Sequence, residues 1–120
     1  MYKQNTPLDE SERLFYTDVF IDLDSIAEDP HINWKRLFKC TAWYHTVRAR
    51  YDSVDYNVIA LKSYSIVVAL FDLESNQLIS RGRYSQTTYK HVYKFRKLLI
   101  ESGYTIKGDN NLNLVSWFNN

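Results

Sequence analysis

Hydrophobic and polar positions are most regularly ordered between residues 58 and 100 of the chain. Two apolar runs, residues 58–61 and 66–73, have the length and composition of strands. The second run is almost uninterrupted, which favours a central strand covered on both faces. The polar residues 74–77 then predict a hairpin loop, in which Asn76 is best able to adopt a positive φ. The middle of the chain is therefore expected to form antiparallel strands.

A third strand is predicted at residues 78–84, where apolar and polar side chains alternate. Because successive side chains of a strand point to opposite faces, Arg81 and Arg83 should share one face. Two arginines on the same face favour an exposed or edge position for this strand.

An amphipathic helix is predicted from about Thr88, with a cap at Ser85, Thr87 or Thr88 and a stop at Gly103. Apolar side chains recur every three or four residues on the face expected to pack against the sheet, and lysines recur on the other side. The apolar positions are Tyr89, Val92, Phe95, Leu98 and Leu99, and the basic ones are Lys90, Lys94 and Lys97.

The first half of the chain is less regular. Residues 18–23 alternate as a strand does, and we favour a short strand or extended piece there, although the same residues can also begin a helix. A turn of helix is expected at residues 25–28, before Pro30. Apolar residues at helical spacing predict the first main helix at residues 32–45. Residues 1–10 are polar and are expected to be flexible.

Residues 46–51 alternate again and predict a strand with Val47 and Ala49 facing the core and two arginines facing solvent. Residues 104–106 and 112–117 are expected to add one short edge strand, joined through a turn at residues 108–111. Together these elements predict a single α+β domain over residues 1–120. Its antiparallel sheet should have four or five strands, with two main helices packed on it.

The composition is that of a chain able to bury a core, since 45% of its residues are hydrophobic and 16% aromatic. Cys40 is the only cysteine, so no internal disulfide can form and a reducing compartment is expected. The polar N-terminus lacks the apolar stretch of a secretory signal. No apolar run approaches the roughly 20 residues of a membrane span. We therefore expect a cytoplasmic protein without membrane contact, either a monomer or a homodimer.

The charges are unevenly distributed although the net charge is only +1. Residues 1–30 hold eight acidic and two basic side chains. Residues 31–51 hold five basic side chains and residues 81–100 hold six, and neither block holds an acidic one. These two basic blocks can be compensated by the acidic blocks, or they can form a basic surface for an acidic partner.

Motifs for catalysis are not found in the sequence. No serine lies in a nucleophile elbow, no glycine-rich phosphate loop occurs, and the carboxylate pair Asp22 and Asp24 has no neighbouring Lys, His or third acid to complete a site. No metal and no cofactor are expected, because the candidate ligands have no metal-motif spacing, although folding can still assemble them. These candidates are His31, Cys40, His45 and His91.

A strand, a turn and a second strand ending in the aromatic Tyr84 are followed by a Ser/Thr-rich cap and a helix with an early histidine, His91. In this order of elements, residues 58–99 resemble a small domain of unknown function found in phage-encoded proteins. The resemblance implies a viral or prophage origin and leaves the first half of the chain outside it. It implies no mechanism, because that family has no settled activity.

These features lead to one main hypothesis and one alternative. The chain is expected to be a small non-enzymatic phage or prophage accessory protein in the host cytoplasm. It would bind and inhibit a host protein or ribonucleoprotein with an acidic surface, above all a defence nuclease complex, in an anti-CRISPR-like manner. The alternative is a regulatory protein that binds nucleic acid. Either partner would contact the basic strand–helix corner, with tyrosines as anchors: Arg81, Arg83, Tyr84, Lys90, Tyr93, Lys94 and Lys97.

Overall fold

Two helices and six strands make up the computed structural model of the chain, which describes residues 8–81, 85–107 and 113–114. The helices are α1 (Glu10–Ala27) and α2 (Gln86–Glu101). The strands are β1 (Lys35–Phe38), β2 (Ala42–Tyr51), β3 (Val54–Ser63), β4 (Ile66–Asp72), β5 (Gln77–Ser80) and the short β6 (Asn113–Leu114).

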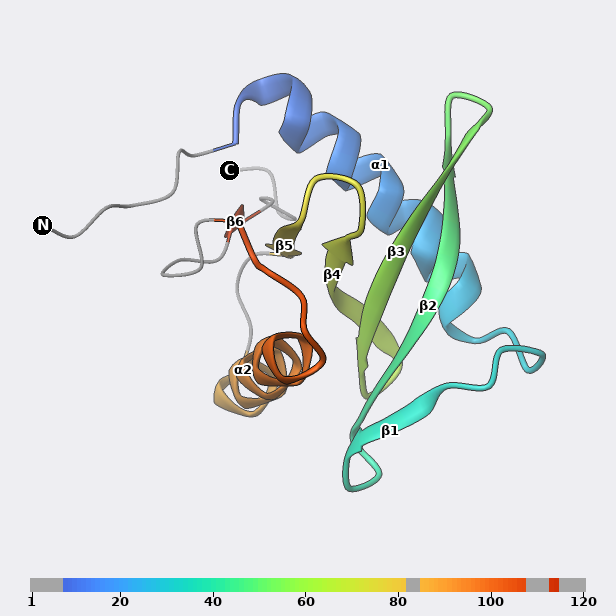
Figure 1. Cartoon of the computed structure of the whole chain (residues 1–120). Coiled ribbons are helices and arrows are strands. Elements are labelled where there is room, and N and C mark those ends of the chain that lie inside the picture. Colours follow the sequence, from blue (N-terminus) through green and yellow to red (C-terminus); the bar gives the residue numbers. More distant parts are fainter. Residues whose placement is uncertain (1–7, 82–84, 108–112, 115–120) are drawn as a thin grey trace, which may run out of the picture.

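The strands form one sheet in the order β1 to β6 (Figure 1). Strands β1 to β5 pair antiparallel with their neighbours, and β6 pairs parallel with β5. The predicted α+β class, an antiparallel sheet with two helices, is thereby confirmed.

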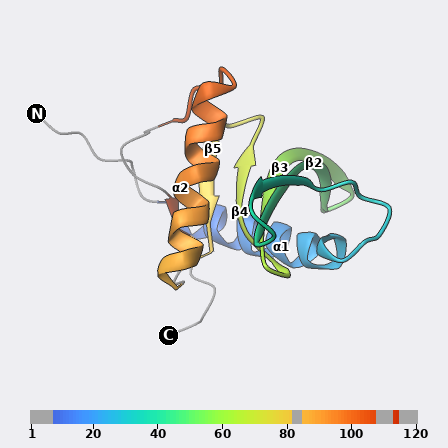
Figure 2. The same cartoon turned by 90° about the horizontal axis from the view of Figure 1, so that it is seen from below.

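The two helices cover opposite faces of this sheet. In β3, Val58 and Ala60 pack in the core that holds α1, whereas Ile59 and Leu61 pack in the core that holds α2. Figures 1 and 2 show α2 running across the direction of α1 on the other side of the strands. Because both faces are covered there, β4 and residues 58–61 of β3 need apolar side chains at successive positions. This explains the uninterrupted apolar run in β4, which was predicted to be a central strand. Neither helix is long and apolar enough to cross a membrane.

Helix α1 replaces the strand predicted at residues 18–23. The Asp9 carboxylate accepts a hydrogen bond from the backbone N–H of Glu12, and the Glu12 carboxylate accepts one from the backbone N–H of Asp9. This capping box begins the helix. The two-residue alternation was misleading because it spans only a short window, whereas buried residues at helical spacing continue along α1: Tyr16, Val19, Phe20, Leu23 and Ala27.

Strands β1 and β2 replace the helix predicted at residues 32–45. The chain reverses between them at residues 39–41, where Lys39 has a φ of 48°. This left-handed conformation is usually occupied by Gly or Asn. Because a lysine occupies it, the sequence carries no turn signal at this position. The apolar residues at helical spacing therefore led to a wrong prediction.

The second half of the chain follows its predicted elements more closely. Ser85 caps α2 by accepting from the backbone N–H of Thr88, and Gly103 follows the helix with a φ of 97°. Asn76 has the expected positive φ, 59°. Residues 104–106 form no strand, whereas β6 lies within the predicted segment 112–117.

Lys62 connects the end of α1 to the sheet. Its ammonium group donates a hydrogen bond to the carbonyl oxygen of Ala27 at 3.1 Å. The same ammonium lies 4.7 Å from the ring centre of Trp34 and 5.2 Å from that of Trp43. Burial lowers the pKa of Lys62, an effect that the nearby Glu28 opposes. This lysine is therefore used inside the fold and is not part of a basic surface.

Candidate partner-binding site

Two turns and helix α2 meet at one end of the sheet. The pairing of Ala42 with Ser63 places the β1–β2 turn (residues 39–41) beside the β3–β4 turn (residues 64–65). The backbone N–H of Tyr64 donates to the carbonyl oxygen of Thr41 at 2.8 Å and joins the two turns directly. Three segments that are distant in the sequence thus share one surface.

His91 of α2 holds the three segments together. Its imidazole is fully buried, with Nδ1 2.8 Å from Ser63 Oγ and Nε2 3.1 Å from Thr41 Oγ1. The Thr41 hydroxyl donates its proton to the carbonyl oxygen of Phe38. It must therefore accept from Nε2–H, and Nδ1 accepts from the Ser63 hydroxyl. The neutral imidazole has a partner for each nitrogen.

Burial lowers the pKa of His91, and the positive charge of Lys94 lowers it further.

The distance between Ser63 and His91 is also that of a nucleophile and its base. However, Ser63 is only 3% exposed and His91 is 0% exposed. A substrate could reach Ser63 only if α2 moved away from the turns, so these contacts serve to hold the turns against the helix.

Lys39 and Lys94 converge on the ring of Phe38. Their ammonium nitrogens lie 5.1 Å and 4.6 Å from its centre. Lys39 belongs to the first basic block of the sequence and Lys94 to the second, so folding brings the two blocks together. Among the described residues, no carboxylate forms an ion pair with either lysine.

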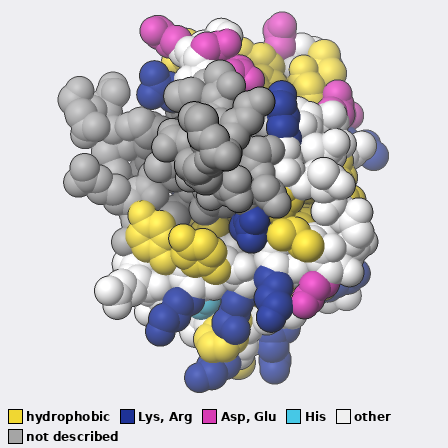
Figure 3. Space-filling view, turned by 60° about the vertical axis from the view of Figure 1, so that its left-hand side comes forward, with side chains coloured by type: hydrophobic (Ala, Val, Ile, Leu, Met, Phe, Trp, Pro, Cys, Tyr) yellow, Lys and Arg dark blue, Asp and Glu magenta, His cyan; other side chains and the backbone are white. Residues whose placement is uncertain are grey.

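The exposed side chains around this point, together with the half-buried Phe38, are called the basic surface below. Tyr64 and Tyr93 are 52% and 62% exposed in it. Figure 3 shows Lys and Arg side chains gathered over the lower part of one face, whereas Asp and Glu side chains lie mostly at its upper end. The basic surface consists of Phe38, Lys39, Tyr64, Lys90, Tyr93, Lys94 and Lys97.

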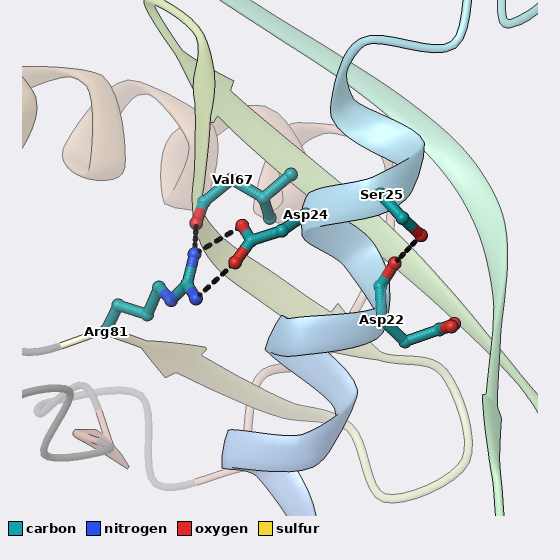
Figure 4. Close-up of polar contacts among 5 residues, drawn as sticks. All are labelled: Asp22, Asp24, Ser25, Val67 and Arg81. Atoms are coloured by element: carbon teal, nitrogen blue, oxygen red, sulfur yellow. Dashed lines mark hydrogen bonds and ion pairs between the residues drawn. The ribbon is translucent and has the colours of Figure 1, made fainter.

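Arg81 does not belong to the basic surface, although it was expected to face solvent. It is only 4% exposed, and its guanidinium contacts both carboxylate oxygens of Asp24 at 2.8 Å and 2.9 Å (Figure 4). It also donates to the carbonyl oxygen of Val67 at 2.8 Å. The expectation was wrong because α1, which the sequence pattern did not reveal, covers this side of the sheet and supplies Asp24.

The remaining predicted site residues divide into two groups. Lys90, Tyr93, Lys94 and Lys97 are exposed on α2. Arg83 and Tyr84 lie outside the described residues.

The sequence did not predict three residues of the basic surface, Phe38, Lys39 and Tyr64. Their place beside α2 depends on the register of β2 and β3 and on the two turns. The first basic block contains Phe38 and Lys39 and was the signal for them, whereas Tyr64 lies outside both basic blocks.

A model of a family of unknown function, DUF8033, matches residues 32–109. The chain belongs to the DUF8033 family. The matched span contains β1 to β5, α2 and the whole basic surface, whereas α1 precedes it. The resemblance to a domain of unknown function is confirmed, but the match begins at residue 32 and not at residue 58. No curated protein and no solved structure matches the chain.

The candidate metal ligands of this DUF8033 protein are engaged elsewhere or lie apart. Both nitrogens of His91 are hydrogen-bonded, and the ring of His45 lies 6.2 Å from that of Trp34. His31 and Cys40 are exposed. Within the ranges that the structure describes, no three His, Cys, Asp or Glu side chains gather as a metal site would require.

The carboxylates of Asp22 and Asp24 have structural partners in the DUF8033 protein. Asp22 accepts from the backbone N–H of Arg50 at 3.0 Å, and its own carbonyl oxygen accepts from the Ser25 hydroxyl (Figure 4). Asp24 binds Arg81. The two acids therefore connect α1 to the edge of β2 and to the end of β5.

Proposed function

We propose that the chain is a non-enzymatic binding protein whose basic surface docks on an acidic macromolecule. The observation that carries the proposal is the convergence of Lys39 and Lys94 on Phe38. Like charges gathered around one ring repel each other, and within the described part of the chain no carboxylate forms an ion pair with either lysine. An acidic partner would relieve this repulsion and would be attracted over a long range.

The preferred partner is a host protein or ribonucleoprotein, above all a defence nuclease complex. The chain would then be an anti-CRISPR-like inhibitor of phage or prophage origin that acts in the host cytoplasm. Its small size and its resemblance to a phage-encoded domain support this choice. The exposed rings of Tyr64 and Tyr93 support it as well, because tyrosines are frequent anchors in protein interfaces. Inhibition would result from covering the partner's surface.

The second candidate function is nucleic-acid binding. The specific observation in its favour is that exposed tyrosines lie among lysines, as on surfaces where bases stack and phosphates are held. A salt titration distinguishes this function from protein docking. Affinity for a single strand should fall with salt at a log–log slope of about −0.7 for each phosphate contacted.

The test is a pull-down from host lysate with the wild type and the double variant Lys90→Glu, Lys94→Glu. We expect the wild type to recover a defence component and the variant to recover none. A matched control reverses Arg48 and Arg50, which are also exposed but pair with Asp55. This control has the same net charge as the variant and should recover the component.

Recovery of no defence component by the wild type would remove the inhibitor hypothesis. Recovery that is equal for the wild type and the Lys90, Lys94 variant would remove the basic surface from the proposal.

A further inference from the structure

Two residues beside His91 are held in a backbone conformation that disfavours their side chains. Lys39 has a φ of 48° and Tyr64 a φ of 58°, both in the left-handed region. Gly and Asn adopt this region at little cost, as Asn76 does in the β4–β5 turn, but Lys and Tyr do not. Strained residues persist where the surrounding structure compensates for them, and they cluster at functional sites.

The two strained residues lie in turns that a backbone hydrogen bond from Tyr64 to Thr41 joins, and both side chains are exposed. The Tyr64 ring is half exposed, and its centre lies 5.8 Å from that of His91. The Phe38 ring contacts the same imidazole, with 5.9 Å between centres. Because hydrogen bonds with Ser63 and Thr41 fix the imidazole, both rings rest on a rigid support.

Positive charge lies directly beside this aromatic platform. The ammonium groups of Lys39 and Lys94 stand over Phe38, and their side chains come from a turn and from α2. The site therefore combines a flat ring that is open to solvent with two cations that form no ion pair within the described residues.

We propose that Tyr64, Lys39 and Lys94 form a nucleotide site, where Tyr64 stacks on an unpaired base and the lysines hold an adjoining phosphate of a single strand. The inference rests on the proposed use of the basic surface. A duplex keeps its bases stacked on one another and leaves no base face for Tyr64. An acidic protein would also engage the lysines, so polyglutamate, which carries carboxylates but no ring, serves below as the probe for that alternative.

The decisive variant is Tyr64→Gly, because it removes the ring and also relieves the backbone strain. Its resistance to urea should equal or exceed that of the wild type, whereas a purely structural Tyr64 would make the variant less stable. Its affinity for a single strand should fall by about 5- to 150-fold, the usual effect of removing one stacked aromatic. Ser53→Gly is the matched control, since Ser53 has a φ of 64° in the β2–β3 turn at the opposite end of β3.

Binding is measured by fluorescence anisotropy at low salt. The probes are a labelled oligothymidylate, its oligouridylate counterpart, the matching duplex, thymidine monophosphate and polyglutamate. We expect single strands to bind more tightly than the duplex, the mononucleotide or polyglutamate. Lys39→Asn and Lys94→Gln should each weaken binding and reduce the salt slope by about 0.7. Ser53→Gly should bind as the wild type does.

Three outcomes would overturn the site: no binding of either single strand at low salt, equal affinity of Tyr64→Gly and wild type, or preference for the duplex or polyglutamate. Its failure is distinct from that of the proposed function. If the Lys90, Lys94 variant loses the captured partner while Tyr64→Gly keeps it, the basic surface is a docking surface without a nucleotide site.

Discussion

Arg81 and Lys94 belong to the same basic block of the sequence, but folding gives them opposite environments. Arg81 is buried under α1 and forms an ion pair with Asp24. Lys94 is exposed on α2 and stands with Lys39 over a single aromatic ring. A count of charges along the chain does not distinguish the two. What distinguishes them is which helix covers the residue, and whether that helix brings an acid.

The comparison separates a structural charge from a charge available to a partner. Arg81 joins β5 to α1, which precedes the span shared with the DUF8033 family. Removing its partner leaves a buried cation with less compensation, and this is costly. Lys94 keeps its contact with water, so its removal costs little stability. Three substitutions test this difference, from the largest expected effect to the smallest.

The largest effect is expected for Asp24→Asn. The variant loses the charge that faces the guanidinium of Arg81. We expect the free energy of unfolding, measured by urea titration, to fall by roughly 3 kcal/mol. Asp18→Asn, an exposed position on the same helix, should stay within about 0.5 kcal/mol of the wild type. Equal stability of the two variants would show that the Asp24–Arg81 pair contributes no more than a surface charge.

An intermediate effect is expected at His91, which lies between the buried and the exposed charges. Its pKa in the folded state is lower than the ordinary 6.5, so the unfolded chain binds a proton first as the pH falls. The contribution of the neutral imidazole to stability is thus complete above about pH 6.5 and decreases as the pH falls towards the folded pKa. Denaturant midpoints measured between neutral and mildly acidic pH should show this decrease.

The variant His91→Gln should be about 1–3 kcal/mol less stable at neutral pH, because it loses the hydrogen bonds to Ser63 and Thr41. Below about pH 6.5, the stability of this variant should also decrease much less than that of the wild type. His31→Gln is the control, since it replaces an exposed histidine that lies outside these hydrogen bonds. If His91→Gln and the wild type show the same profile of stability against pH, the pH dependence comes from other groups.

The smallest effect is expected for Lys94→Gln. The substitution removes one cation from the Phe38 ring but also reduces repulsion with Lys39. The free energy of unfolding should therefore change by less than about 0.5 kcal/mol. Thermal unfolding at low and high salt measures both contributions, because salt screens the repulsion. A loss above about 1 kcal/mol at either salt concentration would mean that Lys94 is needed for folding, and the contrast with Arg81 would no longer hold.

Local patterns were sufficient for β3, β4, the turn at Asn76 and helix α2. Each of these has a continuous apolar run, a turn residue or a repeated three-to-four spacing within one short window. The same reasoning was right for residues 46–51, which lie in β2 with Val47 and Ala49 buried, but it failed for residues 18–23 and 32–45. There the helix signal of α1 was spread from Asp9 to Ala27, and a lysine occupied the position where a turn usually has Gly or Asn.

For the candidate site, the sequence by itself determined that Lys90, Lys94 and Lys97 share an exposed helix face, because helical spacing is a local property. Only the tertiary structure decided that Arg81 would be neutralised and that Phe38, Lys39 and Tyr64 would join α2. These outcomes depend on strand register and on which helix covers which face of the sheet. Both are set by long-range packing of apolar side chains, which no local spacing of residues encodes.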